Sequence, residues 1–119
     1  MVQKRLESFR YAWQGLADLF RTQANARIHL AAAGAAPGAG LALGLSAAEW
    51  MVLALTIAVV FAAEAFNTAL EYLTDLVSPE PHPLAGKAKD AAAAGVLLTA
   101  LGSVLVGVLL FLPKLLALL

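Results

Sequence analysis

The feature that most constrains this chain is a set of three long apolar stretches that contain no charged residue. They occupy residues 30–48, 50–63 and 91–112. Because a helix needs about 20 apolar residues to cross the hydrocarbon core of a bilayer, the first and third are long enough by themselves. The second is long enough only if it continues into the polar segment that follows it. Three transmembrane helices are therefore predicted, over residues 28–48, 49–77 and 85–112.

The composition of the chain favours a membrane protein over a soluble one. Hydrophobic residues make up 61% of the sequence and charged residues 13%, whereas soluble domains average about 45–50% and about 25%. The alternative is a water-soluble all-α bundle, but no charged helix face after residue 27 would solvate one. The absence of cysteine excludes disulfides and thiolate chemistry. We expect a single all-α membrane domain over residues 1–119.

Residues 1–25 are predicted to form an amphipathic surface helix. Apolar side chains recur there at steps of three and four and share one helical stripe, which consists of Leu6, Phe9, Trp13, Leu16 and Phe20. Such a helix can lie in the membrane interface, with its apolar face in the headgroup boundary. The alternative role of the stripe is packing against the other helices, and the two roles are compatible.

The basic residues predict the orientation of the chain. Of the eight lysines and arginines, all except Lys114 lie before the first span or between the second and third spans. With three spans, these two regions share one side of the membrane, and the positive-inside rule makes that side cytoplasmic. We therefore expect a multi-pass protein with a cytoplasmic N-terminus.

A polar stripe interrupts the second apolar stretch. In "EAFNTALEYLTD" (residues 64–75), about 100° of rotation per residue places Glu64, Asn67, Glu71 and Asp75 within roughly 80° of one another on a helix. Acidic groups that face hydrocarbon cost several kcal/mol each, so the stripe is expected to face protein or water. Three spans in one chain offer few neighbouring helices that could shield the stripe from lipid. The stripe therefore predicts a homo-oligomer. Glu64 is expected near the cytoplasmic edge of the bilayer.

The next segment adds further charges on the same side. "SPEPHPLAGKAKD" (residues 78–90) contains prolines that predict a non-helical connection, together with Glu80, His82, Lys87, Lys89 and Asp90. Acidic residues able to hold Mg²⁺, with lysines nearby, are the ingredients of a nucleotide polyphosphate site. Two alternative roles for these residues remain at this point. They could form an ion or proton pathway, or a purely structural set of polar contacts that includes a Lys89–Asp75 ion pair.

These motifs together resemble the prokaryotic diacylglycerol kinase and undecaprenol kinase family. The pattern is E-x-x-N-[ST]-A-x-E-x-x-x-D, then E-x-H-x-L and A-K-D, and "SFRYAWQGL" and "ARIHL" also fit. The resemblance covers nearly the whole chain. It implies a homotrimeric kinase of the bacterial plasma membrane, with a surface helix and three transmembrane helices per subunit. Such enzymes transfer the γ-phosphate of MgATP to a lipid hydroxyl at the cytoplasmic interface.

The resemblance also implies roles for individual residues. Glu64 matches the catalytic carboxylate, taken as the general base, and Asn67 matches a residue that orients Glu64 or the phosphate. Glu71 matches a metal ligand, and Asp75 matches a supporting acidic position. The nucleotide-contacting positions correspond to Lys4, Tyr11, Glu80, His82, Lys89 and Asp90.

One position departs from the family pattern. Gln23, in "RTQANARIHL", stands where the family generally has a glutamate that pairs with the Glu71 position to hold metal. A glutamine offers one carbonyl oxygen and no charge. Gln23 is kept as a candidate for metal and nucleotide binding, with weaker Mg²⁺ affinity expected.

The acceptor lipid is predicted to be undecaprenol, because "SPEPHPLAGKAKDAAAAGVLL" and "FLPKL" look closer to that type. Diacylglycerol is the alternative acceptor, and a non-enzymatic membrane assembly or ion pathway is a more distant alternative. The candidates for contact with the lipid are Trp13, Phe20, Arg27 and Glu64.

Overall fold

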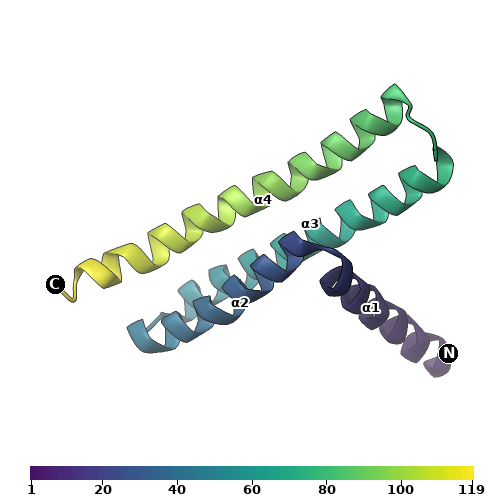
Figure 1. Ribbon diagram of the computed structural model, residues 1–119. Coiled ribbons are helices and arrows are strands. Elements are labelled where there is room, and N and C mark those ends of the chain that lie inside the picture. Colours follow the sequence, from purple (N-terminus) through teal and green to yellow (C-terminus); the bar gives the residue numbers. More distant parts are fainter.

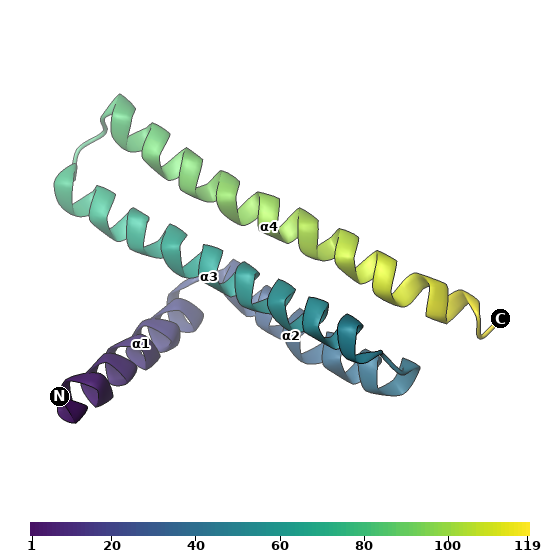
Figure 2. The same cartoon turned by 180° about the vertical axis from the view of Figure 1, so that it is seen from behind.

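The computed structural model describes all 119 residues. The chain forms four helices and contains no strand. The helices are α1 (Val2–Thr22), α2 (Ala24–Leu43), α3 (Ala47–Val77) and α4 (Pro83–Leu116). The two longest helices, α3 and α4, form an antiparallel hairpin, and α2 lies beside the first half of α3 (Figure 1). Seen from behind, α1 projects away from the other three helices (Figure 2). The prediction of an all-helical chain is confirmed.

The corner between α2 and α3 is fixed by local sequence. Gly44 adopts a φ of 75°, a left-handed conformation that favours glycine at the end of a helix. Ser46 and Glu49 then form a reciprocal capping box that starts α3. The predicted span over 28–48 therefore corresponds to a helix that ends at Leu43, and Pro37 lies inside it without interrupting it.

The loop between α3 and α4 covers residues 78–82. Pro83 is the first residue of α4, where its missing N–H would have no partner in the helix. The Nδ1 atom of His82 accepts a hydrogen bond of 3.1 Å from the backbone N–H of Leu84, so His82 caps the helix. The prolines thus set both the turn and the start of α4.

Little of this chain is buried by its own atoms. Only 8 of 119 residues are buried, and α4 contains none of them. Two helices, α3 and α4, are long and apolar enough to cross a membrane, and their apolar residues are too exposed for the core of a soluble protein. At 31 residues, α3 is about 46 Å long, which exceeds the roughly 30 Å of bilayer hydrocarbon.

The helix α2 is less apolar than α3 and α4 and does not count among the candidate membrane spans. Arg27 and His29 lie near its start, and the remainder is rich in alanine and glycine rather than leucine. Its role as a third membrane span therefore stays a prediction.

The helix α1 contacts the other helices only at its C-terminal end. Leu19 is buried there, and the ring of Phe20 packs edge-on against Phe61, with 5.5 Å between the ring centroids. Gln23 has an extended backbone conformation that separates α1 from α2. The rest of the apolar stripe is open, and the side chain of Trp13 is 74% exposed. An exposed apolar stripe is what a helix at the membrane interface requires.

Candidate active site

The polar stripe of α3 turns inward at its first half. Glu64, Asn67 and Thr68 are 2%, 8% and 5% exposed, respectively. The hydroxyl of Thr68 donates a hydrogen bond of 2.9 Å to the backbone carbonyl of Glu64, so the threonine is satisfied within the helix. The other two side chains face a cleft between α2, α3 and α4.

This polar cleft brings together four of the predicted site residues. Gln23 contributes from the α1–α2 corner, while Glu64, Asn67 and Glu71 contribute from α3. The amide nitrogen of Asn67 donates a hydrogen bond of 3.2 Å to Oε1 of Glu71, which orients that carboxylate. The remaining residues that line the cleft are Asn25, Ile28, His29, Ala93, Val96, Leu97 and Ala100.

Two oxygen atoms in the polar cleft are buried without a hydrogen-bond partner. They are Oε1 of Glu64 and Oδ1 of Asn67. Buried polar atoms are nearly always hydrogen-bonded, because an unpaired one costs about 1–3 kcal/mol. A site that binds a ligand or carries out a reaction is a physical reason for keeping such atoms free.

His29 is a member of the polar cleft that the sequence did not single out. Its Nε2 atom lies 3.4 Å from Oε1 of Glu64, and Glu64 comes from a different helix. The available signal was a lone histidine near the start of an otherwise apolar segment. That signal says nothing about its partner, because the contact depends on how α2 and α3 pack.

A second hollow lies at the loop end of the hairpin. It gathers four of the polar residues singled out in the sequence, which are Asp75, Glu80, His82 and Lys89. The ammonium group of Lys89 forms an ion pair with Asp75, as the structural alternative anticipated. Asp90 follows on α4, is exposed and lines neither hollow.

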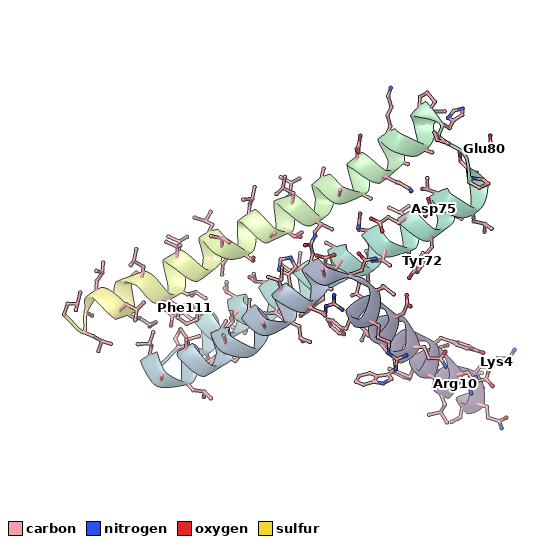
Figure 3. The ribbon with its side chains drawn as sticks, viewed as in Figure 1. Lys4, Arg10, Tyr72, Asp75, Glu80 and Phe111 are labelled. Atoms are coloured by element: carbon pink, nitrogen blue, oxygen red, sulfur yellow. The ribbon has the colours of Figure 1, made fainter.

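Two predicted nucleotide-contacting residues are not brought to these hollows within one chain. Lys4 and Tyr11 lie on the part of α1 that projects away, and Figure 3 places Lys4 far from Asp75 and Glu80. The guanidinium of Arg10 lies 5.2 Å from the centroid of the Tyr11 ring. Neither residue touches the polar cleft in the single chain.

Two of the residues predicted to contact the lipid also make contacts within the chain, near the end of α1. Phe20 packs on Phe61, and the guanidinium of Arg27 donates a hydrogen bond of 3.2 Å to the backbone carbonyl of Arg21. This bond satisfies a carbonyl at the end of α1 that has no partner within the helix.

Comparison with known proteins identifies the family. Residues 10–111 match the family described as "Prokaryotic diacylglycerol kinase". The chain belongs to this family. It is 44% identical over 114 residues to a protein named "Undecaprenol kinase" from Bacillus subtilis (strain 168), covering 96% of this chain and 93% of that protein. The prediction of a lipid kinase from this family is confirmed.

Two further relatives of this kinase are named "Diacylglycerol kinase". The protein from Synechocystis sp. is 49% identical over 114 residues, which cover 95% of this chain and 65% of that protein. The protein from Haemophilus influenzae is 31% identical over 108 residues, which cover 89% of this chain and 92% of that protein. The family thus includes relatives named for two different acceptor lipids.

Proposed function

We propose that this kinase transfers the γ-phosphate of MgATP to the hydroxyl group of a membrane lipid at the cytoplasmic interface of the bacterial plasma membrane. The observation that carries the proposal is the carboxylate of Glu64. It is almost fully buried, one of its oxygens has no hydrogen-bond partner, and it shares a cleft with Asn67 and Glu71. A general base must have a free lone pair that faces the proton it removes.

The reaction follows from this placement. Glu64 accepts the proton of the lipid hydroxyl, and the hydroxyl oxygen forms a bond to the γ-phosphorus. The bond from that phosphorus to the oxygen that bridges to the β-phosphate breaks, and its electron pair leaves with ADP. Glu64 then returns the proton to water. Positioning and charge stabilisation supply most of the catalysis in phosphoryl transfer.

Two residues of the polar cleft are proposed to hold Mg²⁺. Magnesium binds oxygen ligands and usually takes one or two carboxylates together with substrate phosphates. Glu71 and Gln23 line the same cleft, and the Asn67 amide already orients the Glu71 carboxylate. These two residues would hold the ion, which neutralises phosphate charge when bound. With only one carboxylate in this pair, we expect ATP to supply the remaining negative charge.

The nucleotide is proposed to lie towards the loop end of the hairpin. Glu80, His82 and Lys89 line the second hollow, and Asp90 follows on α4. Lys4 and Tyr11 lie outside both hollows, so in this proposal they act on a site to which another copy of the chain contributes. The absence of any fully buried residue from α4 supports association with further helices. The proposed assembly is a homotrimer, a number that rests on the family resemblance.

We propose that α1 is the surface helix of each subunit and that α2, α3 and α4 are the three membrane helices predicted over 28–48, 49–77 and 85–112, with the N-terminus in the cytoplasm. In this arrangement the exposed apolar stripe of α1 lies in the headgroup region. Trp13, Phe20 and Arg27 lie on α1 or at its corner with α2, where they are candidates for contact with the lipid.

Undecaprenol is the favoured acceptor. The relative named for it matches almost end to end in both chains, whereas the more identical relative named for diacylglycerol extends well beyond the match. Because the relative from Synechocystis sp. that is named for diacylglycerol has the higher sequence identity, diacylglycerol is the second candidate acceptor.

The deciding experiment offers both lipids in competition to the purified protein in detergent micelles with radiolabelled ATP and Mg²⁺. We expect label in the lipid fraction, with undecaprenyl phosphate predominating. Predominant labelling of diacylglycerol would reverse the choice of acceptor. Labelling of neither lipid would favour a non-enzymatic assembly or an ion pathway.

A further inference from the structure

His29 is the one basic side chain within ion-pair distance of Glu64. No lysine or arginine lines the polar cleft. The residues that α4 contributes to the cleft are all apolar, namely Ala93, Val96, Leu97 and Ala100. The nearby cations have other partners, because Lys89 pairs with Asp75 and Arg27 donates to a backbone carbonyl. Within one chain, His29 is therefore the basic neighbour of Glu64.

The contact also involves the unpaired atom of Glu64. Oε1 lacks a hydrogen-bond partner, and Nε2 of His29 approaches it to 3.4 Å. An imidazole with its proton on Nε2 donates one hydrogen bond from that atom. Catalytic hydrogen bonds are often long in ligand-free structures and shorten when substrate binds.

His29 also occupies a boundary between two environments. It lines the polar cleft together with Glu64, and it lines an apolar crevice between α2, α3 and α4 that Glu64 does not reach. The crevice extends to Phe111, which α4 directs towards α2 and α3 (Figure 3). A side chain at this boundary is well placed to fix the end of the carboxylate that is nearest the apolar region.

We propose that His29 is a positioning residue for Glu64, a role that rests on the proposed function of Glu64 as the base. The imidazole holds Oε1 by a hydrogen bond, which fixes the carboxylate rotamer and leaves the other lone pairs of the carboxylate for the proton of the acceptor hydroxyl. His29 itself takes no proton from the substrate and makes no bond to it. Its contribution is to the rate of the chemical step, since the nucleotide residues lie elsewhere.

The test compares three substitutions at one position. His29→Ala removes the donor and is expected to lower kcat about 10- to 100-fold, the cost of a misplaced catalytic group, with an unchanged KM for ATP. His29→Gln places an amide nitrogen near the position of Nε2 and is expected to restore most of kcat. His29→Asn has the same amide on a shorter side chain and is expected to resemble alanine. Leu30→Ala, at the neighbouring residue that lines neither hollow, is the matched control.

The comparison of glutamine with asparagine keeps the test decisive even if the alanine variant does not fold. Equal kcat values for those two variants, or a wild-type kcat for His29→Ala, would overturn the positioning role. The proposed function is checked separately with the wild type and Glu64→Gln. If the wild type labels neither lipid, or if Glu64→Gln retains the full rate, the base role itself fails, and the positioning role fails with it.

Discussion

The hydroxyl of Tyr72 donates a hydrogen bond of 2.6 Å to Oδ2 of Asp18, across 54 residues of sequence. The bond joins the C-terminal end of α1 to the polar half of α3. Beside it, the hydroxyl of Thr22 donates to the backbone carbonyl of Asp18 at 2.8 Å. Since α1 touches the other helices only at this end, the Tyr72–Asp18 bond helps to hold α1 against α3.

Removal of this bond should loosen α1 without unfolding the hairpin. The chain has no cysteine, so Ser8→Cys provides a single site on α1 for a spin label. Tyr72→Phe keeps the ring and removes only the hydroxyl, and we expect faster motion of the label. Asp18→Ala should have the same effect, and the double variant should add nothing, because both changes remove one interaction. Unchanged spectra in both single variants would show that α1 is held by apolar contacts alone.

Substitution of the proposed base should separate chemistry from folding. Glu64→Gln keeps the size of the side chain but cannot accept the proton, so lipid phosphorylation should fall at least about 100-fold. Helix content by circular dichroism should stay at the wild-type level. Glu49→Gln is the matched control, since it removes a carboxylate from the same helix at the end remote from the cleft, where Glu49 pairs with Lys114 at 3.1 Å. A Glu64→Gln variant at the wild-type rate would exclude Glu64 as the base.

Replacement of Gln23 by glutamate should strengthen the proposed metal site. Gln23→Glu adds a charged oxygen ligand to the polar cleft that contains Glu71, and we expect half-maximal activity at a several-fold lower Mg²⁺ concentration. The measurement is a Mg²⁺ titration at fixed ATP. Gln14→Glu adds the same charge on the exposed part of α1 and should leave the titration unchanged. An unchanged or weaker response in Gln23→Glu would remove residue 23 from the metal site.

The arrangement within α3 was predictable from sequence because a single helix fixes its own geometry. A rotation of about 100° per residue is enough to place Glu64, Asn67 and Glu71 on one face, and the structure has all three in one cleft. The end of α2 also had a readable signal. Ser46 and Glu49 have the spacing of a capping box, which starts the next helix and rules out a span that continues to residue 48.

The periodicity of apolar residues in the sequence could not predict which residues of different helices touch. The pairing of His29 with Glu64 and of Asp18 with Tyr72 depends on the angles and offsets at which α1 and α2 pack on α3. A hydrophobic pattern indicates which face of a helix is buried but not which residue of the neighbouring helix it meets. The distance of Lys4 from the two hollows has the same origin, because the direction of α1 is set at the Gln23 break.

The close approach of α2 and α3 depends on the absence of a side chain at Gly40. A Cβ atom at this position would lie 2.8 Å from both Leu45 and the ring of Trp50, closer than real Cβ contacts. Gly40→Ala should therefore destabilise the protein by about 1–3 kcal/mol, the usual cost of overpacking. Gly38→Ala is the matched control on the same helix, because a Cβ there meets nothing within 4 Å. Alanine favours a helix interior over glycine by up to about 1 kcal/mol, so the control should be neutral or stabilising. Thermal unfolding in detergent would measure both, and equal midpoints for the two variants would show that the side chains of Leu45 and Trp50 move aside at little cost.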